Sequence, residues 1–276
     1  MKPKELLNKL NILNMYQLMI LFLTILLSFG LFDLFQAGTA AKVITQVITA
    51  ITQIITALFV CILLEIFFNY IKSRVQQQKF AFKIPYSAII TALLIAGILA
   101  PETQWYIIAV ASSIAIAIKH IAKSLAFVNN HTVFNPTALG IVTTAIIFSS
   151  ANSWWIASNI YLVILFGLII AYKIRRHYLA ISYIIAHSII FALYAFFKYG
   201  PKEIINYLLF ANLFFAFFML IEPKTSPAQP KKQWIYGAIV AALAFVFLQL
   251  APTLDHNLMA LLISNIVLFL TNKKIY

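Results

Sequence analysis

The sequence predicts an all-α integral membrane protein with about ten transmembrane or half-membrane helices in two pseudo-symmetric halves that form an inverted repeat. Hydrophobic residues make up 63% of the 276 residues and charged residues only 10%, and the mean hydropathy is +0.95. A water-soluble chain of this length could not bury so much apolar surface, so lipid must solvate most of it. Apolar runs recur along the chain, and basic residues gather between them.

Ten apolar segments account for the predicted helices. They lie at residues 16–36, 43–71, 86–100, 104–127, 136–150, 153–173, 178–197, 203–221, 234–250 and 257–271. The third and fifth have only 15 residues each. This gives about 22 Å of helix against a hydrocarbon core of about 30 Å. Short segments beside prolines indicate half-helices that meet near the membrane midplane, although tilted neighbours with polar ends fit the length equally well.

The basic residues favour a topology in which both termini face the cytoplasm and each segment crosses once. In that topology 17 of the 20 Lys and Arg residues lie inside, and the other three, Lys42, Lys198 and Lys202, lie outside. Membrane proteins retain positive charge on the cytoplasmic side, so this distribution supports ten crossings. The net charge of +13 thus reflects topology. Because the basic residues form no single stripe or arm, no nucleic-acid partner is expected.

We expect a single polytopic membrane domain over residues 1–276. It would have a cytoplasmic segment at 1–15, a first half at 16–150 and a second half at 151–276. The single cysteine, Cys61, lies inside an apolar run, so neither an intrachain disulfide nor a cysteine-ligated metal is expected. No small-residue cleavage site closes the first apolar run, so that run should be retained. These features predict a multi-pass protein of the prokaryotic cytoplasmic (inner) membrane.

Polar residues inside apolar segments are candidate functional groups. Four threonines recur every three or four residues and share one helical face, namely Thr45, Thr49, Thr52 and Thr56. We expect this face to point into the bundle, where hydroxyls either bond across helices, the commoner role, or line a conducting path. Glu65 is a carboxylate within an apolar segment, where it is either functional or near the inner interface. Asn265 is a further intramembrane polar residue. The lone histidines His120 and His187 are either structural, the commoner role, or metal or proton-relay residues.

Two proline-containing stretches, "AFVNNHTVFNPTALG" and "FFMLIEPKTSPAQPKKQWIYG", interrupt apolar runs on the predicted cytoplasmic side. Non-helical backbone at membrane depth persists only where protein or water satisfies its polar groups. We therefore predict that both stretches line one polar cavity open to the cytoplasm; the alternative is two ordinary surface loops. The predicted cavity residues are Asn129, Asn130, His131, Asn135, Pro136, Glu222, Thr225 and Ser226.

A faint internal similarity supports the inverted halves. "GILAPETQWYIIAV" and "FMLIEPKTSPAQPKKQWIYGAIV" each join a short apolar run, a Pro/Glu/Thr cluster, Gln-Trp and an apolar helix. The two clusters fall on opposite sides of the membrane in the predicted topology, as an inverted repeat requires. The chain has no HExxH, GxSxG, Walker A or GxGxxG motif, so no catalytic residue is assigned.

These stretches resemble one known family, the D subunit of Rnf electron-transport complexes and the related B subunit of the sodium-pumping NADH:quinone reductase. "VFNPTALG" is similar to the family's FNPA..G motif, and "FFAFFMLIEPKTSPAQPKKQWIYG" to its FMaTDP.TSP....g..iyG motif. "PYSAIITALLIAGILAPETQWYIIAVASSIAIAIKHIAKS" and "LMALLISNIV" resemble two further stretches. The resemblance covers residues 43–150 and 153–270. It implies a membrane subunit of an ion-translocating redox complex, with other membrane subunits as partners.

Two departures limit what the resemblance implies. The family's glycine-rich turn reads "IAKSLAFVNNHTV" here, without glycine. Family members carry flavin mononucleotide (FMN) on a threonine of a Ser-Gly-Ala-Thr-like motif, but the corresponding stretch is "IIFSSANSWWIASNIY". Covalent FMN is therefore not expected, while a non-covalent flavin stays open. The alternative function is a stand-alone channel or transporter for a small solute, built on the family's urea-channel-like scaffold.

Overall fold

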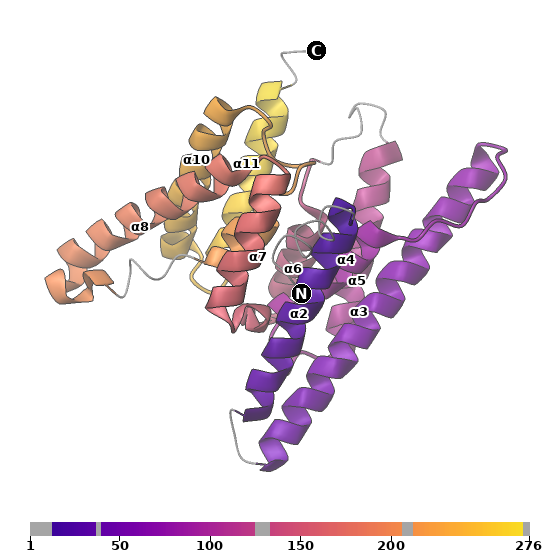
Figure 1. Ribbon diagram of the computed structural model, residues 1–276, viewed down its shortest axis with the longest axis horizontal. Coiled ribbons are helices and arrows are strands. Elements are labelled where there is room, and N and C mark those ends of the chain that lie inside the picture. Colours follow the sequence, from indigo (N-terminus) through magenta and orange to yellow (C-terminus); the bar gives the residue numbers. More distant parts are fainter. Residues whose placement is uncertain (1–12, 37–39, 125–132, 206–211, 273–276) are drawn as a thin grey trace, which may run out of the picture. The chain divides into compact units, whose positions relative to one another are not determined.

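The regular elements of the computed structural model are helices, as Figure 1 shows. This confirms the predicted all-helical class for the described residues, which are 13–36, 40–124, 133–205 and 212–272. An isolated antiparallel bridge joins Leu99 and Asn152. The chain divides into two compact units. Unit 1 runs to Ile121 and includes Thr143–Asn159, and unit 2 comprises Ala122–Val142 and the chain from Ile160 onward.

Unit 1 is built mainly from α2 (Met15–Gln36), α3 (Ala40–Val75), α4 (Tyr86–Ile98), α5 (Trp105–Ser124), the second half of α6 (Pro136–Phe148) and the 3-10 turn η1 (Trp155–Ala157). The 36 residues of α3 correspond to about 54 Å of helix. This exceeds the hydrocarbon core of about 30 Å, so α3 reaches beyond it, and the basic residues Lys72 and Arg74 lie in its last turn.

Unit 2 holds the first half of α6, α7 (Ile160–Lys173), α8 (His177–Tyr199), η2 (Pro201–Glu203), the π-helical turn η3 (Phe215–Met219), α10 (Pro230–Leu250) and α11 (His256–Asn272). Helices α8 and α10 cross at a glycine. A Cβ on Gly237 would lie 2.7 Å from the backbone oxygen of Leu179 and 2.9 Å from Cβ of Ser182. The absence of a side chain thus lets the two backbones approach closely, as is common between membrane helices.

Helix length separates two classes of element. Within the described residues, four helices are long and apolar enough to cross a membrane: α2, α3 from Val43 onward, α8 and α10. Helices α4 and α6 have 13 residues each, or about 20 Å. Both are shorter than the hydrocarbon core of about 30 Å, and the predicted half-helices that meet near the midplane stay a prediction.

Two apolar segments are more broken than the sequence predicts. In the segment 153–173, α7 begins only at Ile160, because Trp154 adopts a left-handed backbone conformation (φ 52°) and a 3-10 turn follows it. In the segment 203–221, the described part contains η2 and η3. The side-chain oxygen of Asn212 accepts a hydrogen bond from the backbone N–H of Phe215, 2.8 Å away.

The threonine face of α3 is not its buried face, which corrects the expectation that it points into the bundle. Thr45 and Thr52 are exposed, and the buried face consists of Val43, Ala50, Gln53, Ala57, Cys61 and Glu65. The Thr52 hydroxyl donates to the backbone oxygen of Ile48 over 2.8 Å, and Thr49 donates to Thr45 in the same way. Hydroxyls satisfied within their own helix can face lipid at low cost.

Matching turns repeat in the two units. Ala100–Thr103 in unit 1 and Glu222–Thr225 in unit 2 each have proline in the second position. In each turn, the N–H of the threonine donates to the C=O of the first residue, over 2.9 Å and 3.1 Å respectively. Each turn follows a short apolar helical element and precedes a long helix. The sequence similarity that suggested inverted halves thus coincides with a shared local geometry.

Candidate functional site

Glu65 is a buried carboxylate in the bundle of unit 1. It stands in α3, ten residues before the helix ends, and is 7% exposed. Lys119 of α5 reaches it, and its Nζ donates to Oε2 of Glu65 over 2.9 Å. Lys119 is itself only 3% exposed. Charged groups are almost never buried to this degree unless they are paired, so each residue accounts for the burial of the other.

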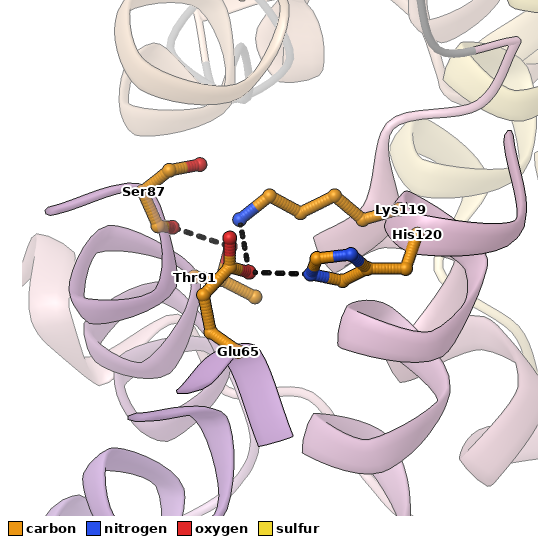
Figure 2. Close-up of polar contacts among 5 residues, drawn as sticks. All are labelled: Glu65, Ser87, Thr91, Lys119 and His120. Carbon is orange, nitrogen blue, oxygen red and sulfur yellow. Dashed lines mark hydrogen bonds and ion pairs between the residues drawn. The ribbon is translucent and has the colours of Figure 1, made fainter. Parts of the chain in front are cut away.

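His120 approaches the same carboxylate oxygen. Its Nε2 lies 3.1 Å from Oε2 of Glu65, and Figure 2 shows Lys119 and His120 converging on Glu65 from one end of α5. The imidazole stacks on Phe68 of α3, with ring centroids 4.8 Å apart and an interplanar angle of 18°. A lone histidine in a helix is usually structural, whereas His120 lies at the buried carboxylate.

Helix α4 supplies uncharged groups beside this cluster. Figure 2 shows Ser87 and Thr91 near Glu65 and Lys119. The Thr91 hydroxyl donates to the backbone oxygen of Ser87 over 3.0 Å, so its proton is committed to its own helix. One turn before Glu65 on α3, Cys61 is fully buried. We call Glu65, Lys119 and His120 the acid–base cluster.

Helical periodicity positions the acid–base cluster. On α3, Ala57, Cys61 and Glu65 are buried at intervals of four residues, and on α5 Ala111, Ala115 and Lys119 follow the same interval. Residues four apart lie on one face of a helix. Lys119 therefore ends the buried face of α5 and is directed into the unit. This periodicity is the sequence signal that could have identified Lys119 as a buried residue.

In the acid–base cluster, an ammonium nitrogen and an imidazole nitrogen lie 2.9 Å and 3.1 Å from one carboxylate oxygen. Such a set can bind, hold and pass on a proton. Burying an ion pair costs desolvation that its attraction offsets only in part. Ionisable residues within membrane segments are for this reason functional-site candidates. Among the described residues, no group of three or more His, Cys, Asp or Glu side chains could hold a metal ion.

A second polar cluster lies in unit 2 around Asn265, which is 2% exposed. In the amide orientation that satisfies all its partners, Asn265 donates to the Thr225 carbonyl over 3.1 Å and to the Tyr236 hydroxyl over 2.6 Å. Its side-chain oxygen accepts from the backbone N–H of Asn135 over 3.0 Å. This orientation is assigned from the hydrogen bonds. We call Asn135, Thr225, Tyr236 and Asn265 the asparagine cluster.

Asn135 also anchors the start of α6. Its side-chain oxygen accepts from the backbone N–H of Ala138 over 3.0 Å, as an N-cap does, and its Nδ2 donates to the backbone oxygen of Met219 over 3.4 Å. Pro136 follows as the first helical residue, where a missing N–H is tolerated. The two interrupted stretches therefore meet where Asn135 bonds Met219, and Asn265 links Asn135 to Thr225.

The remaining predicted cavity residues flank the turn after η3. Hydroxyls of Thr225 and Ser226 donate to Glu222, to its Oε2 over 3.3 Å and to its backbone oxygen over 2.7 Å respectively. Nε of Arg176 donates to the Ser226 hydroxyl over 3.2 Å, and partial burial lowers the pKa of Arg176 from its ordinary value, which still leaves arginine charged. Asn129, Asn130 and His131 lie outside the described residues. The polar cavity itself stays a prediction.

The stretch that corresponds to the family's flavin motif has a structural role in this chain. The indole N–H of Trp155 donates to the backbone oxygens of Ala96 and Leu99, over 2.9 Å and 3.1 Å, and so satisfies carbonyls at the end of α4. Ile156 packs directly against Gly97. A Cβ added to Gly97 would lie 2.6 Å from the Cβ of Ile156, so only glycine fits at this position. Residues 145–205 contain no threonine, so this stretch offers no attachment point for a threonine-linked FMN.

The purified protein should therefore show no flavin fluorescence after denaturing gel electrophoresis. A phosphoester-linked flavin would survive denaturation, whereas a flavin held by non-covalent contacts would be released. The mass of the intact chain, measured by mass spectrometry, tests independently whether FMN is attached. A fluorescent band at the mass of the chain, with a mass increase equal to FMN, would contradict this expectation.

Four helices long enough to span a membrane, several shorter apolar helices and a buried charged cluster define a polytopic membrane protein. A family model described as the NQR2, RnfD, RnfE family matches residues 10–161 and 150–275. Together the matches extend over nearly all of the sequence, so the chain belongs to this family and is a membrane subunit of the Rnf/Nqr type. A search of curated proteins gave no match.

Proposed function

We propose that the chain is the subunit through which a redox complex of the Rnf/Nqr type moves a cation across the prokaryotic cytoplasmic membrane, with both termini inside. The observation that carries this proposal is the buried contact of Glu65 with Lys119 and His120. Glu65 precedes the basic residue Lys72 by seven positions, about 10 Å along the helix. The carboxylate would thus lie in the cytoplasmic half of the membrane.

Energetics support a functional role for the acid–base cluster. A buried ion pair is often no more stabilising than well-packed apolar residues of similar volume. Tight helix packing in this unit is already supplied by apolar and small residues on the buried face of α3. The charged pair thus adds little that packing alone would not give, whereas translocation of a cation needs a charge inside the membrane.

This chain would carry no covalent flavin. Electrons would therefore pass through other subunits of the complex. In the same proposal, Asn135, Glu222, Thr225 and Ser226 line a polar cavity that opens to the cytoplasm. Hydrogen bonds around the asparagine cluster would hold the interrupted backbone open to water at that cavity. Lipid and the membrane subunits of the complex are the expected partners.

The test uses the assembled complex in inverted membrane vesicles that receive an electron donor. Electron transfer and the membrane potential are measured together for the wild type, Glu65→Gln and Asp33→Asn. Glu65→Gln should reduce charge translocation per electron by about 10²-fold, the usual effect of losing an acid–base group. Asp33 is an exposed carboxylate of the same unit, and Asp33→Asn should leave the ratio unchanged. Equal ratios in all three proteins would refute a role of Glu65 in translocation.

The alternative function is a stand-alone channel for a small solute. It is favoured because the stretch that corresponds to the flavin motif is used here to hydrogen-bond the end of α4. It predicts that the purified chain, reconstituted alone in liposomes, passes a small neutral solute without an electron donor. A swelling assay on such liposomes separates the two functions, because the redox subunit should conduct no solute by itself. Rapid swelling relative to empty liposomes would favour the channel.

A further inference from the structure

We propose that unit 2 binds the headgroup of an anionic phospholipid at the membrane surface where α8 and α10 begin. Two stretches of the chain, 172–182 and 222–234, contain six basic residues and a single carboxylate, that of Glu222. We call the six the basic cluster: Lys173, Arg175, Arg176, Lys224, Lys231 and Lys232. This site is separate from the acid–base cluster of unit 1, and it does not depend on the proposed function.

Hydrogen bonds hold the two stretches together. Gln233 is fully buried, and its Nε2 donates to the backbone oxygens of Arg175 and Ala228, each over 2.9 Å. The Ser182 hydroxyl donates to the backbone oxygen of Trp234 over 2.6 Å. Three residues separate α7 from α8, and Arg175 among them has a left-handed backbone conformation (φ 58°). The basic cluster is therefore a fixed feature of the fold and not a set of independent loops.

The basic cluster lies at one surface of the membrane. Helices α8 and α10 are both long and apolar enough to span it, and they begin at His177 and Pro230. Because the hydrogen bond from Ser182 to Trp234 joins them within their first two turns, both helices begin on the same side. A spanning helix begins near the headgroups, so the basic cluster lies at headgroup level. The positive ends of the two helix dipoles add to its charge there.

A row of aromatic rings marks the same level independently of charge. Tyr172, His177, Tyr178 and Trp234 follow one another with ring centroids 4.9 Å, 4.2 Å and 6.2 Å apart. The two tyrosines and the tryptophan are exposed. Exposed tyrosine and tryptophan rings at the ends of spanning helices lie among lipid headgroups, where their apolar and polar parts are both solvated.

Exposed aliphatic residues continue from the basic cluster into the membrane. On α10, Lys231, Ile235 and Ile239 recur every four residues, so they share one face, and all three are exposed. On α8, Ile181 and Ile185 are exposed in the same way. A phospholipid has this order of groups, a phosphate followed by acyl chains. Soluble phosphate or an acidic protein surface would match the charge but not the aliphatic residues, so a lipid fits best.

The charge of the basic cluster predicts selection by headgroup. Each Lys or Arg near the surface strengthens the attraction to anionic lipid by about fivefold. Arg175 is exposed, and a guanidinium can bond two phosphate oxygens at once. A zwitterionic headgroup carries no net charge and gains little from the same residues. We therefore expect phosphatidylglycerol to be preferred over phosphatidylcholine at this site.

The experiment uses Trp234 as a local reporter. The purified full chain is reconstituted in phosphatidylcholine bilayers with rising fractions of brominated phosphatidylglycerol or brominated phosphatidylcholine, because bromine quenches tryptophan fluorescence at short range. The difference between matched proteins with and without Trp234→Phe isolates the signal of Trp234. Brominated phosphatidylglycerol should quench this signal at the lower fraction. Arg175→Gln and Lys231→Gln should each reduce the preference by about fivefold.

A matched control removes charge elsewhere. Lys79 and Lys83 are exposed cations between α3 and α4, and Lys79→Gln/Lys83→Gln should leave the preference at Trp234 unchanged. Salt tests the wild type without any substitution. A rise from about 0.1 M to about 1 M shortens the Debye length from about 10 Å to about 3 Å and should lower the preference.

Three outcomes would overturn the inference. The first is equal quenching of Trp234 by the two brominated lipids in the wild type. The second is a preference that the control variant lowers as much as Arg175→Gln does, or that salt leaves unchanged. The third is release of another subunit from the assembled complex by Arg175→Gln with no change in quenching, which would assign the basic cluster to an acidic protein partner.

Discussion

Lys119→Met is expected to destabilise the protein by about 3–5 kcal/mol, because it leaves the carboxylate of Glu65 buried without its counter-ion. Both side chains are nearly inaccessible, with side-chain exposures of 4% for Lys119 and 10% for Glu65, so water cannot replace the lost partner. The free energy of unfolding would be measured in detergent by denaturant titration. Lys72 is an exposed lysine in the last turn of α3 and provides the control. Lys72→Met should change the free energy of unfolding by less than about 0.5 kcal/mol.

The double variant Glu65→Gln/Lys119→Met completes the thermodynamic cycle. Removing both charges avoids the uncompensated ion, so this variant should regain most of the stability that Lys119→Met loses. The coupling energy then measures the interaction of the pair directly. A double variant as unstable as the sum of the single variants would show that the pair seen at 2.9 Å contributes no coupling.

Periodicity and composition located most of the helices in the described part of the chain. Apolar runs located α2, α4, α6 and α11 nearly to the residue, since lipid forces each helix to satisfy its own backbone. Segment length also predicted that α4 and α6 are shorter than a full membrane crossing. The break before α7 was missed, because it depends on the left-handed conformation of Trp154 and on tertiary hydrogen bonds of Trp155.

The candidate site could be predicted only in part. Glu65 was identifiable as a carboxylate within an apolar run, but its partner lies 54 positions away. Periodicity indicates which residues share a face and does not indicate which other helix that face meets. The charge distribution did not indicate that Lys119 is buried. Lys119 was counted among the cytoplasmic charges, yet it is 3% exposed because the buried face of α5 extends to it.

The threonine face shows a second limitation of periodicity, which identifies a shared face but not whether that face is buried. Its regular spacing is real, but the residues one position further along α3, Ala50, Gln53 and Ala57, are the buried ones. Small side chains permit closer packing between membrane helices than β-branched ones. Gln53 also donates to the backbone oxygens of Ala100 and Thr103, over 2.7 Å and 3.1 Å. A face offset by one residue rotates by about 100°, which is enough to turn the threonine hydroxyls away from the bundle.

Asn265→Leu should destabilise the protein by about 3 kcal/mol, the largest effect expected in unit 2. A leucine has similar volume but would leave two backbone groups without their partner, the N–H of Asn135 and the C=O of Thr225. Each buried polar group left unsatisfied costs about 1–3 kcal/mol. Tyr236→Phe removes only a hydroxyl and should cost about 1 kcal/mol. Both changes would be measured as the free energy of unfolding in detergent.

The neighbouring residue of α11 provides the matched control. Ser264 is 1% exposed, and its hydroxyl has no hydrogen-bond partner among the described residues. Ser264→Ala therefore removes a buried polar group that satisfies nothing, and it should leave stability unchanged or slightly higher. A loss in Ser264→Ala equal to that in Asn265→Leu would mean that any change on this face of α11 disturbs packing. The distinct effect expected of Asn265 requires instead that its amide holds α6, α10 and the turn after η3 together.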